Sequence, residues 1–194
     1  MYFLLMNTPP VNRNILWSLN LPLKIKIFLW YLGRGVTLTK DNLAKRGWKG
    51  CLKCRFCNQN ESIQHLFFDC YLARNIWRII YFALNIERPN NINHIIGSWI
   101  ANKGTTHRKK LLIGVAAMFW SIWLCCNDVV FTFKPKPSIM QVLFRATYWL
   151  RFWRLLQKEQ PQHEILAVCR SLEVVAMEIF ASHGWRSNAR LEGA

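Results

Sequence analysis

The chain has 194 residues, of which 52% are hydrophobic and ten are tryptophans. A chain of this length and composition can bury a sizeable core, which argues against extended disorder. Its formal net charge of +16 is typical of proteins that contact a polyanion, most often nucleic acid and less often an anionic membrane surface.

The positive charge is concentrated near the start of the sequence. Residues 1–60 contain ten lysines and arginines and a single acidic residue, Asp41. The first ten residues, MYFLLMNTPP, lack the basic start and the long apolar run of a secretory signal peptide. We therefore expect an intracellular protein, nuclear or cytoplasmic and not secreted, in which the seven cysteines do not form disulfides.

Two helices are predicted before the cysteines. The first spans about residues 21–32, because Pro22 suits a first helical position and Gly33 suits a helix end. The second is short, with Thr39 as the N-cap and a stop at Gly47. Its residues 43 and 44, Leu and Ala, are expected to face the core.

The twenty residues from Cys51 to Cys70, CLKCRFCNQNESIQHLFFDC, contain four cysteines and one histidine. Zinc prefers four thiolate and imidazole ligands in a tetrahedron. Cys54, Cys57, His65 and Cys70 form the pattern C-x2-C-x7-H-x4-C. The gap from Cys51 to Cys54 is the same, so a frame with Cys51 in place of Cys57 remains open. The frame with Cys57 is favoured because its loop to the histidine is shorter.

His65 and Cys70 are five residues apart. On an unbroken α-helix their side chains would point about 140° apart, too far to share one ion. We therefore predict a break near residues 69–71, with a long helix beginning at about Cys70 and running to Leu84. A short two-stranded ribbon is also conceivable at the cysteines, and it would be the only strand pairing in the chain.

The remaining sequence predicts further helices. Residues 92–100 favour a short helix, and longer helices are expected over residues 106–131, 138–157 and 163–183, the last ended by Gly184. The segment Leu111–Cys126 has no charged residue. It is shorter than the roughly 20 residues that cross a bilayer, so a buried core helix is expected and no membrane contact.

The quoted residues resemble the reverse transcriptase zinc-binding domain, which occurs in plant polyproteins of LINE-type, non-LTR retrotransposons. The resemblance runs from about Leu16 to Trp77. It is carried by KIKIFLW, TLTKDNLAKRG, the C-x2-C pair, Glu61 and His65 as E-x3-H, HLFFDC and IW. It implies Cys54, Cys57, His65 and Cys70 as ligands of one structural Zn²⁺.

The sequence departs from the family pattern in two places. Tyr71 stands where members often have a proline after the last cysteine. Downstream, FWSIWLCCNDVVF resembles the pattern W-x-x-W-x-x-RN-x-x-x-F, with Cys126 in the place of the arginine. The first departure leaves the predicted break to the zinc geometry alone, and the second makes a charge role at position 126 doubtful.

The predicted fold class is therefore mainly α, with a small helical domain centred on a zinc knuckle and an extension of long helices. The expected divisions are an N-terminal tail over residues 1–14, the reverse transcriptase zinc-binding domain over 15–86, the helical extension over 87–186 and a C-terminal tail over 187–194.

A catalytic role is not expected. Four protein ligands close a zinc site, whereas a catalytic zinc keeps a position open for water. The chain has three aspartates, none adjacent, so it lacks the paired aspartates of a polymerase, and no Gly-rich phosphate loop or small-molecule substrate site is evident. The four other histidines are scattered.

Two functions fit these features. The first is a nucleic-acid-binding module for RNA or single-stranded DNA, with contacts from Lys45, Arg46, Trp48, Lys49, Lys53 and Arg55. In this reading Trp48 stacks on a base, although it could equally pack on the zinc turn as a core residue. The second is a protein-interaction module that packs against a reverse transcriptase or self-associates through exposed apolar surface.

Overall fold

The computed structural model describes residues 13–101, 103–131 and 135–182, and within these ranges the regular elements are all helical. This confirms the predicted mainly α class. The elements are α1 (Arg13–Trp17), α2 (Leu23–Gly33), α3 (Lys40–Ala44), the π-helix η1 (His65–Asp69), α4 (Tyr71–Leu84), α5 (Ile92–Ile96), α6 (Ser98–Ala101), α7 (Thr105–Phe131), α8 (Ile139–Arg154) and α9 (Glu159–Ser182).

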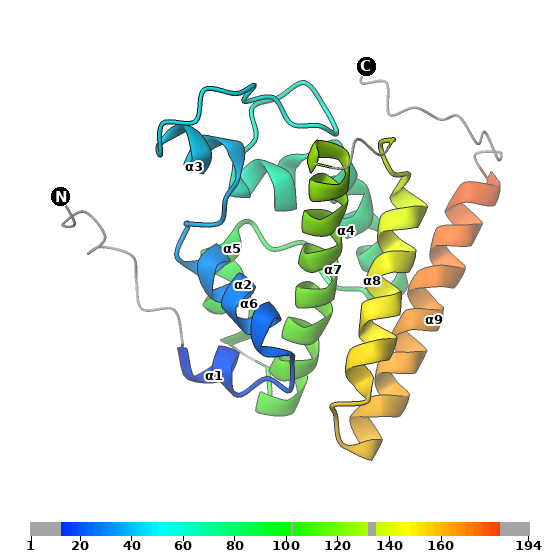
Figure 1. Cartoon of the computed structure of the whole chain (residues 1–194). Coiled ribbons are helices and arrows are strands. Elements are labelled where there is room, and N and C mark those ends of the chain that lie inside the picture. Colours follow the sequence, from blue (N-terminus) through cyan, green and yellow to red (C-terminus); the bar gives the residue numbers. More distant parts are fainter. Residues whose placement is uncertain (1–12, 102, 132–134, 183–194) are drawn as a thin grey trace.

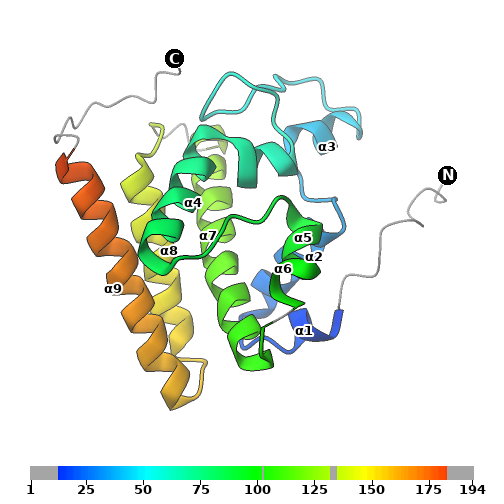
Figure 2. The same ribbon diagram turned by 180° about the vertical axis from the view of Figure 1, so that it is seen from behind.

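Helix α7 runs through the middle of the molecule (Figure 1). Helices α8 and α9 lie to one side of it and run alongside each other, and α2 crosses its other side (Figure 1). The reverse view places α4, α5 and α6 on the opposite face (Figure 2). Helix α3 and the cysteine loop lie beside the C-terminal end of α7 (Figure 1). The cysteines are thus located at one end of the long helices.

Helix α7 is the core helix that the uncharged segment predicts. Ala116, Ala117, Phe119 and Ile122 are completely buried, and Phe119 contacts Phe67 of η1 with their ring centroids 4.8 Å apart. By length and composition α7 is also the one described helix that could cross a membrane. In this fold its apolar surface is instead covered by α2, α8 and η1.

Several helix ends differ slightly from the prediction. Pro22 is the N-cap of α2 and Gly33 its last residue, whereas Gly35 adopts the left-handed backbone, with φ of 69°, that turns the chain. Thr39 occupies the N-cap position of α3 as predicted, although its side chain makes no capping hydrogen bond. The helix ends at Ala44, three residues before the predicted stop at Gly47, which has φ of 88°. Helix α9 begins at Glu159, four residues early, and the predicted stop at Gly184 lies outside the described residues.

The expected orientation of α3 is wrong. Leu43 and Ala44 are only half-buried, whereas Lys40 and Asn42 are buried. The Asn42 amide donates to the carbonyls of Gly35 and Thr37, both at 2.8 Å. Polar contacts with the preceding turn, which hydrophobic periodicity cannot reveal, therefore decide which face of this short helix is buried.

One buried cluster extends from Leu16 to Ala176 and crosses the predicted boundary between residues 86 and 87. It joins η1 and α4 to α7, α8 and α9. The long helices thus share a hydrophobic core with the cysteine region. Of the predicted tails, residues 13 and 14 belong to α1, and the others lie outside the described residues.

Candidate metal centre

The first two candidate ligands lie on a tight hairpin. An isolated antiparallel bridge pairs Lys53 with Asn60, and the backbone N–H of Cys54 donates to Gln59 O at 2.8 Å. The backbone N–H of Phe56 points at Cys54 Sγ, 3.4 Å away. This hairpin brings Cys54 and Cys57 to one side of the turn and is the short ribbon considered from the sequence.

The other two ligands lie at the two ends of the π-helix η1. The Cys70 N–H donates to His65 O at 2.6 Å, the i→i+5 bond that defines a π turn. Cys70 has ψ of 142° and is the N-cap of α4, which begins at Tyr71. The predicted break is thus confirmed. The π turn was not predicted, and it brings residues five apart close enough to share an ion.

Two backbone carbonyls of the π turn accept hydrogen bonds from side chains that come later in the chain. Trp77 Nε1 donates to Phe67 O at 3.1 Å, and Arg88 Nη1 donates to Phe68 O at 2.8 Å. At its other end, Ser62 Oγ accepts from the His65 N–H at 3.0 Å. A π turn is rare and poorly bonded within itself, so these three contacts hold the backbone that carries His65 and Cys70.

The four candidate ligand atoms converge. The Sγ atoms of Cys54, Cys57 and Cys70 and a ring nitrogen of His65 all lie within 4.8 Å of one another. Cys70 Sγ is 3.9 Å from Cys54 Sγ and 4.0 Å from Cys57 Sγ. Tetrahedral Zn²⁺ with Zn–S bonds of about 2.3 Å requires S···S separations of about 3.8 Å. The donor set and its spacing therefore fit zinc.

One separation is tighter than zinc geometry requires. Cys57 Sγ lies 3.1 Å from His65 Nε2, whereas ligands on tetrahedral zinc would be about 3.6 Å apart. A shift of about half an ångström in the half-buried Cys57 side chain would remove the difference. Cys51 is exposed and is not part of the group, an arrangement that favours the frame with Cys57.

The protein alone stabilises only one thiolate here. Hydrogen bonding from Cys70, assisted by His65, outweighs burial and lowers the pKa of Cys54 to about 4. Burial raises the pKa of Cys57. The hydrogen bond to Cys54, together with burial, raises the pKa of Cys70. Only a cation among them would let all three ionise together, and three thiolates are what a Cys₃His zinc site needs.

A buried ion pair lies next to the centre, and sequence reasoning missed it. The side chains of Lys40 and Glu61 are 6% and 3% exposed, with Nζ 3.8 Å from Oε2. Glu61 Oε1 also accepts from the Lys40 N–H at 3.2 Å, and Lys40 Nζ donates to Lys53 O. Burial raises the pKa of Glu61, and Lys40 partly opposes that rise. The pair ties α3 to the hairpin.

Cys126 completes this cluster from α7. Its Sγ lies 3.7 Å from Glu61 Oε2, and burial raises its pKa far above the usual range. Cys126, which stands where the similar family has an arginine, is therefore a neutral thiol. It contacts Glu61, the glutamate of the E-x3-H motif. A single sequence carries no signal for this contact, because the two residues lie 65 positions apart.

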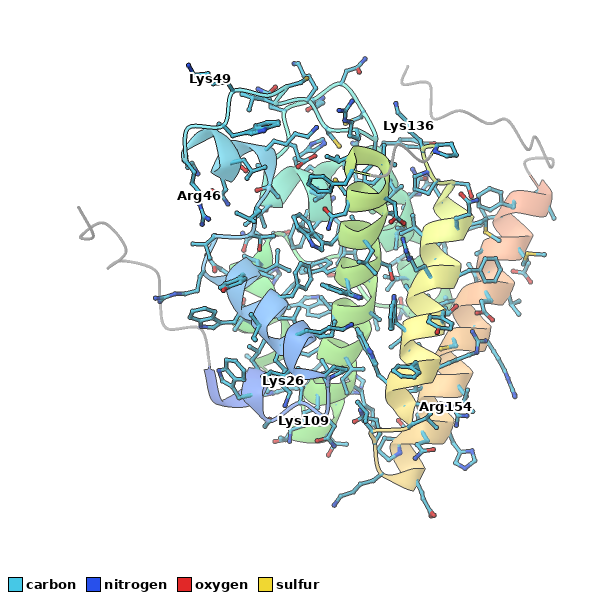
Figure 3. All side chains as sticks on the ribbon, in the orientation of Figure 1. Lys26, Arg46, Lys49, Lys109, Lys136 and Arg154 are labelled. Atoms are coloured by element: carbon cyan, nitrogen blue, oxygen red, sulfur yellow. The ribbon has the colours of Figure 1, made fainter. Side chains whose placement is uncertain are left out.

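The predicted nucleic-acid-binding residues lie around the hairpin and are exposed: Lys45, Arg46, Trp48, Lys49, Lys53 and Arg55. Arg46 and Lys49 project outward beside α3 (Figure 3). Lys45 lies 3.8 Å from Asp41, an exposed contact. Other basic side chains, such as Lys109 and Arg154, lie at the opposite end of the molecule (Figure 3). The positive charge is thus not confined to the metal centre.

Trp48 is 40% exposed, so it is not a core residue. Its indole lies directly over Gly50, where an added Cβ would fall 1.9 Å from the ring. A glycine at position 50 is what lets the ring lie flat against the loop. The remaining exposed part of the ring is the apolar surface that base stacking requires.

Comparison with known proteins agrees with this geometry. Residues 1–77 match the family described as zinc-binding in reverse transcriptase. The predicted resemblance is confirmed over this range. A ribonuclease H-like protein of Arabidopsis thaliana is 31% identical over 65 residues, which are 33% of this chain and 10% of that protein. No solved structure matches the chain significantly.

The matched segment includes the whole candidate metal centre. All four candidate ligands, together with Lys40 and Glu61, lie inside the matched segment. The segment ends at Trp77, in the middle of α4. Helices α7, α8 and α9 lie beyond it and share the hydrophobic core against which the matched segment packs.

Proposed function

We propose that this protein is a zinc-stabilised, non-catalytic module derived from a retrotransposon reverse transcriptase polyprotein, and that it contacts RNA or single-stranded DNA. The observation that carries the proposal is the convergence of three thiols and one imidazole, with the exposed Lys53 and Arg55 on either side of Cys54. The match to the zinc-binding family over residues 1–77 supports the retroelement origin, as does the partial similarity to a plant ribonuclease H-like protein.

One structural Zn²⁺ would be held by Cys54, Cys57, His65 and Cys70. When bound, it would supply positive charge that keeps the three thiolates ionised and would fix the hairpin against η1. With a neutral imidazole, this site carries a net charge of −1. Four protein ligands leave no position for water, which supports a structural role over a catalytic one.

The proposed nucleic-acid contacts come from the loop around this ion. Lys45, Arg46, Lys49, Lys53 and Arg55 would contact phosphates, which are read without sequence preference. Trp48 would stack on an unpaired base, an interaction that tolerates any base. The buried Lys40 is excluded from such contacts because its ammonium is committed to Glu61 and Lys53 O.

Salt titration of binding to a fluorescent single-stranded oligonucleotide tests the proposal. We expect the affinity to fall steeply with salt, with a log–log slope of about −0.7 for each phosphate contact. The double variant Arg46→Gln/Lys49→Gln should weaken binding and reduce the slope by about 1.4. A flat salt response in the zinc-loaded protein would remove the electrostatic basis of the proposal.

A matched control separates a local site from diffuse attraction. The double variant Lys109→Gln/Arg154→Gln removes the same charge at the far end of the molecule (Figure 3). We expect its slope to remain close to that of the parent. If both double variants weaken binding equally, the loop is not the binding site, and the net charge alone is responsible.

A second candidate function is a protein-interaction module. Helix α8 and its C-cap Leu155 expose an apolar stripe in which Phe144, Tyr148, Phe152 and Leu155 are 42–62% exposed and follow helical spacing along one side. Contiguous apolar surface of this kind marks interfaces. Sedimentation of the folded protein, which reports its mass, tests self-association. A monomer that binds no polymerase domain would leave the stripe without this role.

A further inference from the structure

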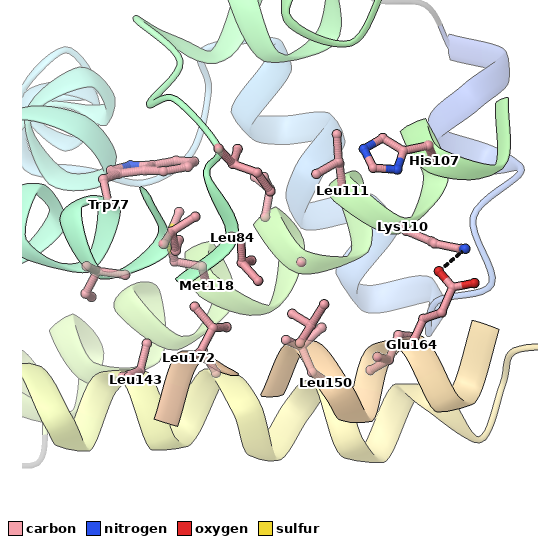
Figure 4. A pocket seen from close by; sticks show the side chains of 18 of the residues that line it. Trp77, Leu84, His107, Lys110, Leu111, Met118, Leu143, Leu150, Glu164 and Leu172 are labelled. Carbon is pink, nitrogen blue, oxygen red and sulfur yellow. Dashed lines mark hydrogen bonds and ion pairs between the residues drawn. The ribbon is translucent and has the colours of Figure 1, made fainter. Parts of the chain in front are cut away.

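A cavity of about 270 Å³ lies beside α7. It is enclosed by α4, α7, α8 and α9, and Figure 4 shows the side chains that line it. Its inner end is bounded by Trp77, Met118, Leu143 and Leu172, all buried. The cavity is thus built between the reverse transcriptase zinc-binding segment and the long helices that follow it.

The chemistry of the inner wall excludes a polar ligand there. Of the nineteen lining residues, three are charged or titratable, and the others are apolar or glycine. An apolar cavity as small as about 150 Å³ stays dry and takes up small apolar molecules. Gly114 of α7 lines this space, and a Cβ built on it would meet no atom within 4 Å. The wall therefore has open space for apolar groups.

The three titratable residues gather at the outer end. His107, Lys110 and Glu164 lie together opposite Trp77, with the dashed contact between Lys110 and Glu164 (Figure 4). The Lys110 side chain is 25% exposed and that of Glu164 is 49% exposed, so this end opens to solvent. The charged groups are separated from the apolar interior along the length of the cavity.

The outer end favours an anion. His107 and Lys110 lie in the first two turns of α7, where the positive end of the helix dipole lies. Glu164 is the acidic residue in the lining, and its carboxylate contacts Lys110. That carboxylate occupies the place that the head group of an anionic ligand would take.

We infer that this cavity binds a single-chain carboxylate amphiphile, with its hydrocarbon chain between α4, α7, α8 and α9 and its carboxylate at Lys110. The chain meets the apolar wall, and the head replaces or joins Glu164 at the ammonium. This site is separate from the metal centre and independent of the proposed nucleic-acid function.

Two ligands with the same chain and different heads provide the test. Decanoate and 1-decanol, each below the concentration at which it aggregates, are titrated into the zinc-loaded full chain by calorimetry. We expect decanoate to bind severalfold more tightly than decanol. Lys110→Met should remove that preference and leave decanol binding unchanged. Glu164→Gln should strengthen decanoate binding about threefold to fivefold, because it frees the ammonium of a partly exposed ion pair.

Filling the cavity tests the site itself. Gly114→Leu places a side chain in the open space and should abolish binding of both ligands. It should also raise the melting temperature, because it replaces glycine within a helix. Ala167→Leu adds the same kind of bulk on the exposed face of α9 and should change neither ligand. Should Gly114→Leu fail to fold, Ala146→Leu fills the cavity from α8.

Three results would overturn the inference. The first is that neither ligand binds the folded parent. The second is that a folded, cavity-filled variant binds decanoate as the parent does, which would place the ligand elsewhere. The third is equal binding of decanoate and decanol that Lys110→Met does not alter, which would mean that the head group is not recognised.

Discussion

Lys40→Met removes the cation of the buried pair beside the metal centre, and we expect a large loss of stability. At 3.8 Å, two unit charges attract by about 4 kcal/mol at an effective dielectric constant of 20. Removing one partner of a buried pair typically costs about 3–5 kcal/mol, because the other charge is left uncompensated. Methionine keeps most of the volume, so the cost is chiefly electrostatic.

The loss should depend on pH. Burial already raises the pKa of Glu61, and without Lys40 it rises further. Between the unfolded and folded pKa values the folded state binds more protons, so stability falls as pH rises through this window. At lower pH Glu61 is more readily protonated, and protonation removes the free-energy cost of its buried, uncompensated charge. The destabilisation by Lys40→Met should therefore be smaller at pH 6 than at pH 8.

Urea unfolding of the zinc-saturated protein at both pH values measures these differences. Lys45→Met is the matched control, because it removes an exposed lysine that contacts Asp41 at the end of α3, and exposed pairs contribute about 0–1 kcal/mol. The double variant Lys40→Met/Glu61→Gln should recover part of the loss. The reasoning is refuted if the two lysine variants cost the same, or if the double variant is no more stable than Lys40→Met.

Three further predictions concern other parts of the molecule. Cys57→Ser should release zinc and lose hydrogen-exchange protection over residues 45–77, both measured by mass spectrometry. The reason is that the free energy of metal binding stabilises the fold at such sites. Unchanged zinc content would contradict the ligand frame. Arg151→Met should cost about 1 kcal/mol at neutral pH, since this partly exposed guanidinium contacts Glu173 at 2.7 Å. Arg151 lowers the pKa of Glu173, so the difference in urea midpoint should vanish as pH falls through that folded pKa, and a difference that persists in acid would argue against the pair. Gly50→Ala should displace the Trp48 ring and weaken oligonucleotide binding while leaving zinc content and melting temperature nearly unchanged; unaltered binding would remove Trp48 from the contact set.

The sequence identified the features that depend on local chemistry. The long helices α7, α8 and α9 follow from uninterrupted apolar periodicity between clear breakers such as the KPKPS segment. The break at Cys70 follows from the geometry of two ligands five residues apart, even without the proline that usually follows the last cysteine. The grouping of the four candidate ligands in space was likewise anticipated from their spacing and from the family resemblance.

Features that depend on partners distant in sequence were missed. Lys40 counts as one more positive charge in a basic segment, yet burial commits it to Glu61. The π turn depends on Trp77 and Arg88, which donate to its carbonyls from later elements. The cavity arises where four helices do not fill the space between them. The periodicity of apolar residues in the sequence indicates which face of a helix is apolar, but not how closely two such faces pack.

The contact from Arg88 to Phe68 O has a consequence for dissection of the protein. Arg88 also lies 3.8 Å from Asp69, and it falls eleven residues beyond the point where the family similarity stops. A fragment cut after residue 77 would retain every sulfur and nitrogen donor but lose the guanidinium that secures the turn carrying two of them. The limit of recognisable homology therefore does not mark the end of the unit that supports the candidate metal centre, because a supporting donor and the shared hydrophobic core lie beyond it.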